Sequence, residues 1–218
     1  MVESSPNIPV QRLVDLHIEY AAGVPGNRES LWHTLGIWQL KQLKYLGLNP
    51  GSHLLDVGCG PLRLGMYVIP FLEDDHFWGV DPYAPYEKLA KAIMKETGCR
   101  KKYTIKIGAD FPFVDSGRKF DFAMAQSVVT HLSNNQLDHL MTNLKRSMAP
   151  GGQFVFTYTD NPYPYGIFYE MEYPMITPAG LNDKYFSKLA ERFEIEYLGC
   201  PGGIEPHPTG QRVGVFQF

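Results

Sequence analysis

The chain has 218 residues, of which 44% are hydrophobic and 13% aromatic, enough apolar material for one sizeable core. Its formal net charge is -3, so the sequence offers no general basic field for a nucleic-acid backbone or an anionic membrane surface. We therefore expect a small-molecule partner, and neither nucleic acid nor a membrane.

Taken in chain order, the sequence first shows two helical patterns, at residues 10–22 and 29–46, with glycines and a proline between them. From residue 53 onward, strands alternate with helices. The expected strands are 53–57, 76–80, 103–107, 120–125 and 153–158, and the expected helices are 62–69, 86–97 and 135–148. Such repeated βαβ units predict a parallel sheet.

The alternation stops after residue 158. A stretch rich in proline and tyrosine, residues 160–178, leads to an expected helix at 182–193. Strands at 194–198 and 212–218 follow with no helix between them. This order implies a terminal antiparallel hairpin.

Cysteine usage and the first residues bear on the cellular compartment. The three cysteines are an odd number at wide spacings, which matches neither a disulfide framework nor a paired zinc-ligand pattern. The opening residues lack a basic segment followed by an apolar run, and they lack the roughly 18 uninterrupted apolar residues of a membrane span. These features favour a reducing, cytoplasmic compartment.

The most informative segment is LLDVGCGPLRLG at residues 54–65, where an apolar strand meets an acid, two glycines and a helix start. Gly58 and Gly60 permit a tight turn and leave no side chain between the backbone and a ligand. Asp56 lies beside that gap, and Asp81 ends the next strand, where a carboxylate can accept both hydroxyls of a ribose. These residues predict a nucleoside site. The alternative for the two acids is turn and cap chemistry at strand ends.

A glycine-rich turn alone does not identify the nucleoside, because dinucleotide-binding domains share it. Their fingerprint would place a third glycine at position 63, which is Arg63 here. The block instead resembles motif I of the class I S-adenosylmethionine methyltransferases. The resemblance spans roughly residues 50–218 and includes the segments FWGVD, IGADF, KFDFAMAQSVVTHL and APGGQFVFT. One departure is Leu62, which stands where the family has a third glycine and is expected to tighten the helix start.

The resemblance implies S-adenosylmethionine as the cofactor and a doubly wound, mostly parallel, Rossmann-like α/β sheet of seven strands. The length of the chain predicts one domain, residues 1–218. Residues 1–48 would form an N-terminal helical lid, and residues 49–218 the cofactor-binding core, with an aromatic insertion at 160–180 that adds to the lid.

The resemblance also implies the contacts of the first two strands with the cofactor. Asp56 would meet the methionine ammonium, directly or through water. The backbone around Gly58 and Gly60 would line the methionine portion, and Asp81 would hold the ribose diol.

Four further residues are implied by the same resemblance. Asp110 would accept a hydrogen bond from the adenine amino group, with Phe111 beside the ring. Gln126 and Ser127, just past the fourth strand, would contact the methionine end.

A base near the methyl group would suffice for catalysis, because methyl transfer is an in-line displacement at an activated carbon. His131, in SVVTHLSNNQLDHL, lies just after the fourth strand at the ligand-binding end of the sheet. Its placement resembles that of the catalytic histidine of plant-type O-methyltransferases, although Leu132 stands where those enzymes have an aspartate. The alternative is a histidine that caps the helix starting near Ser133.

A metal-dependent mechanism, as in catechol-type O-methyltransferases, is not expected. Asp160 and Asn161 follow the fifth strand as in those enzymes, but Asp-Asn-Pro is also an ordinary turn signal. The third ligand position, after the fourth strand, is Gln126 instead of an aspartate. We therefore expect no metal.

The acceptor pocket is expected between the N-terminal helices and the insertion. The helices offer Tyr20, Trp32 and Trp38, and aromatic walls with a few polar tips suit a flat or amphipathic small molecule. Alternatively, these rings pack the lid onto the sheet or form a homodimer contact. The insertion supplies Tyr163, Tyr165, Phe168, Tyr169 and Tyr173.

The sequence thus predicts an S-adenosylmethionine-dependent methyltransferase that O-methylates a metabolite or natural product. One alternative is N- or carboxyl-methylation, for which His131 would be dispensable. Another is a domain that binds S-adenosylmethionine without catalysis, in a regulatory role. Methylation of nucleic acid or protein is disfavoured, because the sequence has no basic patch and no Asn-Pro-Pro-Tyr after the fourth strand.

Overall fold

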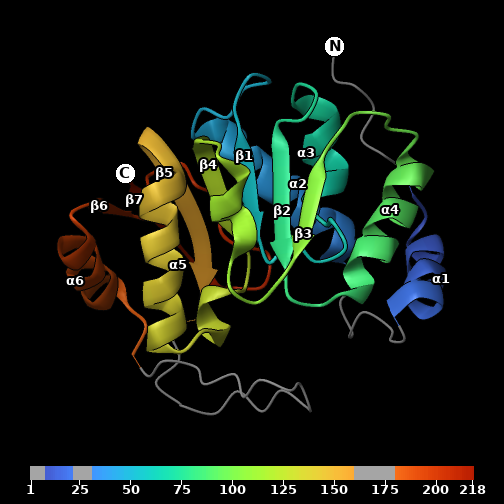
Figure 1. The fold of residues 1–218 in the computed structure, drawn as a ribbon. Coiled ribbons are helices and arrows are strands. Elements are labelled where there is room, and N and C mark those ends of the chain that lie inside the picture. The colour runs from blue at the N-terminus through green and yellow to red at the C-terminus, as the bar shows by residue number, and fades with distance from the viewer. Residues whose placement is uncertain (1–7, 22–30, 160–179) are drawn as a thin grey trace.

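The computed structural model describes residues 8–21, 31–159 and 180–218, which form a seven-stranded sheet with helices on both faces (Figure 1). The strands are β1 (Leu54–Val57), β2 (Phe77–Asp81), β3 (Thr104–Ile107), β4 (Phe120–Ala125), β5 (Met148–Tyr158), β6 (Glu196–Gly199) and β7 (Arg212–Gln217). Their order is β3-β2-β1-β4-β5-β7-β6, with β1 to β5 parallel and β7 antiparallel to both β5 and β6. The predicted doubly wound sheet with a terminal antiparallel hairpin is confirmed.

Alternate side chains of the central strands point to opposite faces of the sheet and pack into two separate hydrophobic cores. In β1, Leu54 belongs to one core and Leu55 to the other, and both are fully buried. Met124 and Ala123 of β4 divide in the same way. Continuous apolar sequence buried on both faces is typical of a central strand in a parallel sheet.

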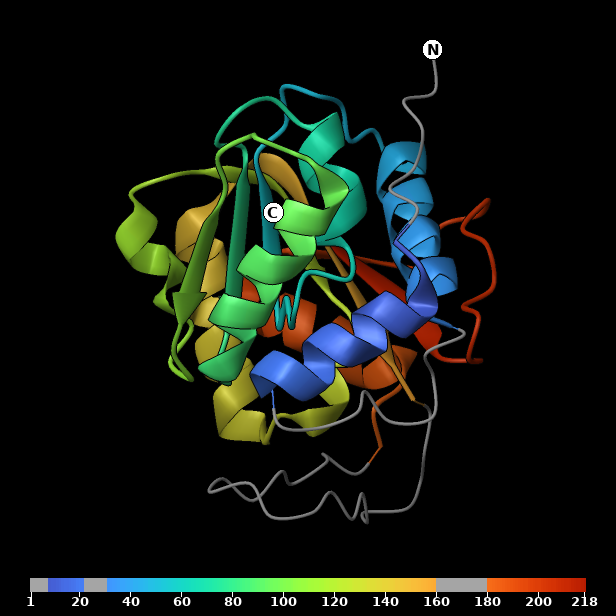
Figure 2. The same ribbon diagram turned by 90° about the vertical axis from the view of Figure 1, so that its right-hand side faces the viewer.

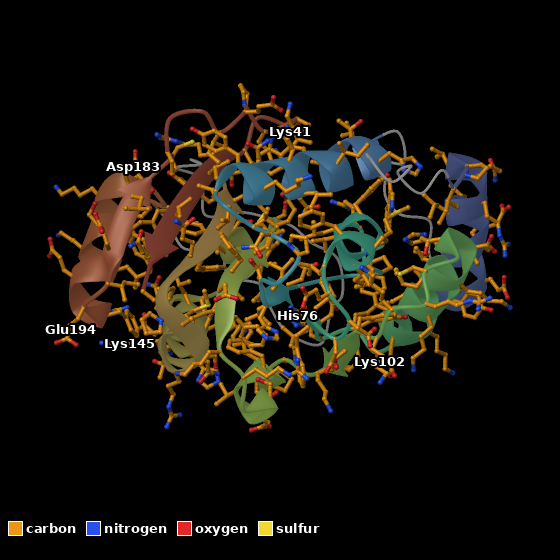
Figure 3. All side chains as sticks on the ribbon, turned by 90° about the horizontal axis from the view of Figure 1, so that it is seen from above. Lys41, His76, Lys102, Lys145, Asp183 and Glu194 are labelled. Carbon is orange, nitrogen blue, oxygen red and sulfur yellow. The ribbon has the colours of Figure 1, made fainter. Side chains whose placement is uncertain are left out.

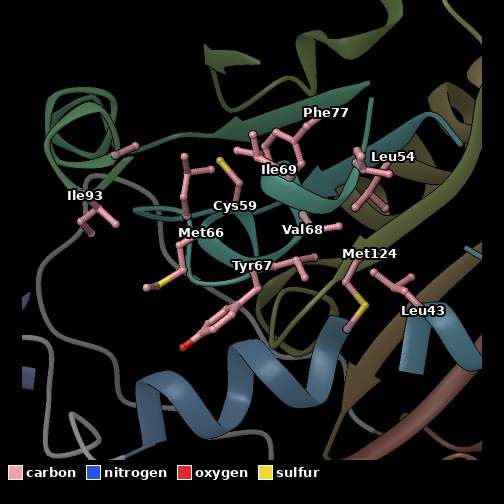
Figure 4. Close-up of a cluster of buried hydrophobic side chains, with 14 of the residues drawn as sticks. Leu43, Leu54, Cys59, Met66, Tyr67, Val68, Ile69, Phe77, Ile93 and Met124 are labelled. Carbon is pink, nitrogen blue, oxygen red and sulfur yellow. The ribbon is translucent and has the colours of Figure 1, made fainter. Parts of the chain in front are cut away.

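Four helices contribute to the first core. They are α1 (Val10–Ala21), α2 (Leu31–Tyr45), α3 (Gly65–Phe71) and α4 (Pro85–Thr97). Figure 4 shows the part of this core around Met66 and Tyr67 of α3. Helix α1 lies beside α4 (Figure 2), and Arg12 of α1 donates a hydrogen bond of 2.6 Å to Glu96 of α4. The N-terminal helices are therefore part of the folded core.

The second core lies under α5 (Asn134–Ser147) and α6 (Asp183–Phe193). The Phe186 ring of α6 packs edge-on against Phe156 of β5, with ring centroids 4.7 Å apart. Outside the core, Lys145 of α5 and Glu194, which directly follows α6, form an ion pair of 2.7 Å (Figure 3). Two short 3-10 helices, η1 (Pro112–Ser116) and η2 (Val129–His131), complete this face. None of the helices in the described ranges is long and apolar enough to cross a membrane.

The helix after β1 begins later than the sequence predicted. We expected it at 62–69, but α3 begins at Gly65 and residues 61–64 form turns. Leu62 has a φ of 67°, and a residue in this left-handed conformation cannot continue a right-handed helix. Its side chain is fully buried against Gly65, where an added Cβ would lie 2.7 Å from Leu62 Cδ2. Leu62 thus adopts the backbone expected of a glycine while filling the core.

The fifth strand is longer than predicted. It begins at Met148 instead of residue 153 and contains the Pro150-Gly151-Gly152 segment that we expected to be a turn. Phe120 pairs with Met148 and Phe122 with Gln153, so β5 bulges between these two pairs. Gly152 permits the bulge, because an added Cβ would lie 3.0 Å from the Phe120 carbonyl oxygen. The turn residues therefore bend a strand instead of starting one.

Candidate cofactor site

The loop after β1 lies against β2 through its backbone. The N–H groups of Gly58 and Cys59 both donate to the Val80 carbonyl, at 2.8 and 3.0 Å. Gly58 and Gly60 have φ angles of 70° and 51°, the left-handed region that glycine adopts without strain. A Cβ on Gly58 would lie 2.4 Å from Val128 Cγ2, so a side chain cannot fit there. The tight turn that the sequence predicted for these glycines is therefore present, while the approach of a ligand to their backbone stays a prediction.

Asp81, at the end of β2, joins this loop to the segment before α4. Its Oδ2 accepts a hydrogen bond of 2.9 Å from the Gly60 N–H, and its Oδ1 accepts one of 2.9 Å from the Tyr83 N–H. Burial raises the pKa of Asp81, and these two backbone hydrogen bonds oppose the rise. The turn-and-cap role is therefore present. Each carboxylate oxygen retains a lone pair for a ligand hydroxyl, so the two roles are compatible.

Asp56, at the end of β1, is the most buried acid of the site, with 3% of its surface exposed. The pKa of Asp56 is raised to about 8, because the raising effects of burial, the larger one, and of the negative charge of Asp81 outweigh the lowering effect of the positive charge of Arg63. No residue in the described ranges donates a hydrogen bond to this carboxylate. Burial disfavours the negative charge of this carboxylate, and no hydrogen-bond donor in the described part of the chain offsets that cost. A cationic ligand would therefore stabilise the charged form of Asp56.

A second polar group gathers where β4, β5 and β7 meet. The Ser127 N–H donates to Thr157 Oγ1 at 2.8 Å, which holds Ser127 at a φ of 58°. Gln211 Oε1 accepts from the Thr157 hydroxyl at 2.6 Å and from the Ser127 hydroxyl at 3.0 Å. Gln126 Nε2 donates to the same oxygen at 3.2 Å and lies 2.9 Å from His207 Nε2. We name these five residues the neutral cluster.

Three members of the neutral cluster were not found from the sequence: Thr157, His207 and Gln211. Thr157 ends the segment APGGQFVFT but was assigned no contact, no motif marks His207 or Gln211, and Gln211 is distant in sequence from Ser127. The signal that could have found Gln211 was the strand topology. A last strand that runs antiparallel to β5 must begin at the edge of the sheet where β4 and β5 end. The expected hairpin could therefore have placed Gln211 beside the residues after β4.

Asp110 and Phe111 follow β3 at the same edge of the sheet. The Gly108 N–H donates to the Asp81 carbonyl at 3.0 Å, and a Cβ on Gly108 would lie 2.9 Å from Asp110 Oδ1. Phe111 is 9% exposed and packs in the second core, 6.0 Å from the His139 ring between centroids. The structure brings Asp110 toward Asp81, while the adenine contacts of Asp110 and Phe111 stay predictions.

His131 closes η2, just before α5. Burial lowers the pKa of its imidazole, which therefore stays neutral at pH 7 and able to accept a proton. The cap of α5 is a capping box made by Ser133 and Gln136, whose side chains exchange hydrogen bonds with each other's backbone N–H groups. This cap fulfils the role that was the alternative for His131. The base role itself stays a prediction.

The tryptophans of the N-terminal helices are core residues. Trp32 is 4% exposed and donates to Met66 Sδ at 3.1 Å. Trp38 is 5% exposed, and its ring lies edge-on to His207 with centroids 4.7 Å apart. Tyr20 is partly exposed near the end of α1. The aromatic residues of the insertion, and Asp160 and Asn161, lie outside the described residues.

The described ranges contain no group of three His, Cys, Asp or Glu side chains that could hold a metal ion. The absence of a metal from the mechanism stays a prediction, because two of the residues considered for it are not described.

Comparison with known proteins agrees with this geometry. Residues 54–152 match a protein-family model described as a methyltransferase domain. The chain is similar in structure to a TehB-like SAM-dependent methyltransferase from Corynebacterium glutamicum, with 20% identity, 94% of each chain covered and a TM-score of 0.59. It is also similar to an S-adenosylmethionine-dependent methyltransferase from Clostridium acetobutylicum, with 12% identity, 86% of this chain and 92% of that chain covered, and a TM-score of 0.60.

A third similar structure is magnesium protoporphyrin IX methyltransferase (ChlM) from Synechocystis with bound SAH. The identity is 14%, the alignment covers 93% of this chain and 92% of that chain, and the TM-score is 0.59. At these identities the solved structures show a shared fold, and the family model adds the methyltransferase domain. Residues 54–152 thus match a methyltransferase domain, and the sheet order agrees with the resemblance of the sequence to the class I S-adenosylmethionine-dependent methyltransferases.

Proposed function

We propose that this chain transfers the methyl group of S-adenosylmethionine to a hydroxyl group of a small molecule. The observation that carries the proposal is the pairing of two buried acids, Asp56 and Asp81, at the ends of adjacent strands beside the glycine loop. Asp56 suits the cationic methionine end, and Asp81 suits the ribose diol.

The chemistry of the site residues fits this cofactor. The open backbone at Gly60 admits a ligand, since the nearest atom to an added Cβ there is Tyr86 Cε2 at 3.9 Å. Gln126 Oε1 is buried and has no hydrogen-bond partner among the described residues, so a donor on the ligand would satisfy it. When bound, the cofactor supplies a methyl group that its sulfonium makes electrophilic.

His131 is the residue to which we assign the acceptor's proton. As the hydroxyl oxygen attacks the methyl carbon, a carbon–oxygen bond forms, the carbon–sulfur bond breaks, and the proton moves to the neutral imidazole. The products are a methyl ether, S-adenosylhomocysteine and the imidazolium of His131. General-base assistance of this kind is worth about 10²- to 10⁴-fold in rate.

A small molecule is the acceptor class that the charge and the relatives favour. The net charge of -3 offers no field for a polyanion. ChlM, one of the similar structures, is named for a porphyrin substrate. We extend that substrate class, a small molecule, to this chain.

Two experiments test the proposal in order. Calorimetry should show that S-adenosylhomocysteine binds and NAD does not; the reverse result would reject the cofactor. The purified chain is then incubated with methyl-labelled S-adenosylmethionine and a metabolite extract, and we expect label in a small-molecule methyl ether. Label in an ester or amine would reject the hydroxyl acceptor, and binding without any labelled product would indicate a regulatory domain.

A further inference from the structure

The loop between β6 and β7, residues 200–211, lies against helix α2 (Figure 2). Side chains of α2 hold this loop by its backbone. Trp38 Nε1 donates to the Glu205 carbonyl at 3.2 Å, and Gln42 Oε1 accepts from the Glu205 N–H at 2.9 Å. Lys41 also forms an ion pair with the Glu205 carboxylate. The loop is therefore fixed to α2 on one side.

His207 connects this loop to the end of β4. Its side chain is buried, and its ring packs edge-on against the Trp38 ring. Its Nε2 lies 2.9 Å from Gln126 Nε2. An amide nitrogen only donates hydrogen bonds, so we assign His207 Nε2 as the acceptor and place the ring proton on Nδ1. Of the two Thr209 groups near Nδ1, the hydroxyl at 3.0 Å is closer than the backbone N–H at 3.2 Å, and it accepts that proton.

The Gln126 amide is held by its nitrogen and open at its oxygen. Three atoms lie within hydrogen-bond distance of Nε2: His207 Nε2 at 2.9 Å, Ser127 Oγ at 3.0 Å and Gln211 Oε1 at 3.2 Å. The buried Oε1 has no hydrogen-bond partner among the described residues. The last side-chain torsion of glutamine is broad and roughly two-fold, so the partners of the nitrogen decide where the oxygen points. His207 is the nearest of these partners.

The direction of this oxygen matters for a cationic ligand. The ammonium of the cofactor's methionine end only donates hydrogen bonds, so it needs the carbonyl side of the amide and not the N–H side. We propose that His207 is a positioning residue that holds Gln126 with its carbonyl oxygen toward the cofactor ammonium, and that α2 fixes His207 through Trp38 and the loop. This inference rests on the proposed cofactor and on the predicted contact of Gln126 with its methionine end.

The test compares two ligands that differ at the methionine end. S-adenosylhomocysteine carries the ammonium, whereas 5′-methylthioadenosine has the same nucleoside and sulfur but no amino-acid end. His207→Phe keeps an aromatic ring beside Trp38 and removes the ring nitrogens. Calorimetry should show that this variant binds S-adenosylhomocysteine about 3- to 10-fold more weakly, the range for one net hydrogen bond. Binding of 5′-methylthioadenosine should stay within about twofold, which also shows that the variant is folded.

A double-variant cycle tests whether His207 acts through Gln126. Gln126→Ala should weaken S-adenosylhomocysteine binding by about 10- to 100-fold, the range for a lost hydrogen bond to a charged group. Adding His207→Phe to Gln126→Ala should change the affinity by no more than about twofold. His207→Gln places an amide oxygen near the position of Nε2 and should retain more affinity than His207→Phe. A full further loss in the double variant would overturn the proposal, because His207 would then act without Gln126.

Tyr45→Phe is the control for a general loosening of the loop. Tyr45 of α2 donates to the Gly202 carbonyl at 2.6 Å, so the variant removes a hydrogen bond to the same loop and leaves the His207 ring nitrogens in place. It should change neither affinity. A selective loss of S-adenosylhomocysteine binding as large as that in His207→Phe would overturn the role of the His207 ring.

A measurement on the wild-type chain applies even if His207→Phe does not fold. Nitrogen NMR of the labelled chain distinguishes protonated from unprotonated imidazole nitrogens, and the His207 ring is identified by its contact with Trp38. At neutral pH, with S-adenosylhomocysteine bound, Nε2 should be unprotonated. A proton on Nε2 would overturn the proposal, because two donors would then face each other.

The outcomes also separate this inference from the proposed function. If the wild-type chain binds neither ligand, the cofactor assignment fails and the inference fails with it. If it binds both, but His207→Phe loses both ligands equally or loses neither, only the positioning role is rejected.

Discussion

The edge of the sheet that forms the site has two halves, which satisfy their polar groups differently. At the ends of β1 and β2, Asp56 and Asp81 are buried carboxylates, and burial raises the pKa of each. At the ends of β4 and β5, the neutral cluster is closed by its own hydrogen bonds, three of which converge on Gln211 Oε1. A bound cation would stabilise the buried carboxylates of the acidic half, whereas the neutral half satisfies most of its polar groups within the chain and leaves Gln126 Oε1 for a donor on a ligand.

The largest effect is expected at His131, which lies on the neutral side of the site. His131→Ala should lower kcat by about 10²- to 10⁴-fold because the base is lost, with S-adenosylhomocysteine affinity nearly unchanged. His131→Gln should behave alike, which separates lost basicity from lost bulk. In the wild type, kcat/KM should rise with pH through an apparent pKa below the usual value of about 6.5, since burial lowers the pKa of His131. Full activity in both variants would indicate an acceptor that is already nucleophilic, such as a carboxylate or an unprotonated amine.

On the acidic half, Asp81→Ala should weaken cofactor binding by about 1 to 3 kcal/mol, the range for leaving buried polar partners unpaired. The N–H groups of Gly60 and Tyr83 lose their acceptor at the same time. Calorimetry with S-adenosylhomocysteine measures the change, and Asp115→Ala, at an exposed acid, is the control. An unchanged affinity would place the ribose elsewhere.

Because the negative charge of Asp56 is buried, the free energy of unfolding of the ligand-free chain should depend on pH. Its folded-state pKa of about 8 lies above its ordinary 3.8, so the folded chain binds this proton more tightly than the unfolded chain. The free energy of unfolding contributed by Asp56 therefore falls as pH rises between these values. Asp56→Asn should raise the free energy of unfolding at pH 8 by about 1 to 3 kcal/mol and change it little near pH 4.

Urea unfolding of the wild type and Asp56→Asn at several pH values measures this difference. Other groups contribute equally to both proteins, so only the difference between the two curves is used. If Asp56→Asn is less stable than the wild type at pH 8, the charge of Asp56 does not destabilise the ligand-free chain, and the contrast between the acidic and neutral halves is wrong.

The smallest effect is expected in the neutral half. Gln211→Ala should lower the free energy of unfolding by about 1 kcal/mol, because Thr157 and Ser127 lose their shared acceptor. The loss should be the same at pH 8 and pH 9, since no carboxylate is involved. Thr157→Val should give a similar loss, and the double variant should lose less than the sum. Additive losses would mean that the two side chains act independently.

Much of this arrangement was predictable from the sequence, because local signals coincide with the sheet. Asp56, Gly58, Gly60 and Asp81 each stand at a strand end or in a turn that the apolar pattern marks, and the structure brings them to one edge. The start of α3 was mispredicted because a buried leucine, Leu62, adopts a conformation that propensity reserves for glycine.

The partners missed by the sequence are those supplied by tertiary packing. Arg63 lies over the Trp32 ring of a helix that precedes the sheet, and Gln211 forms hydrogen bonds with Ser127 and Thr157 across the edge. No spacing rule connects such residues. Only the strand order and the packing of α2 bring them together.

The position of β7 between β5 and β6 bears on the order in which the chain can fold. Strand β6 pairs only with β7 in the described sheet, so neither it nor the outer edge of β5 is satisfied until residues 212–217 are in place. During synthesis, the parallel strands β1 to β5 emerge first and present an open, apolar edge that favours association with other chains. The same late strand is preceded directly by Gln211, which bonds to the turn after β4. A nascent chain would therefore complete its neutral cluster at the same step that closes its aggregation-prone edge.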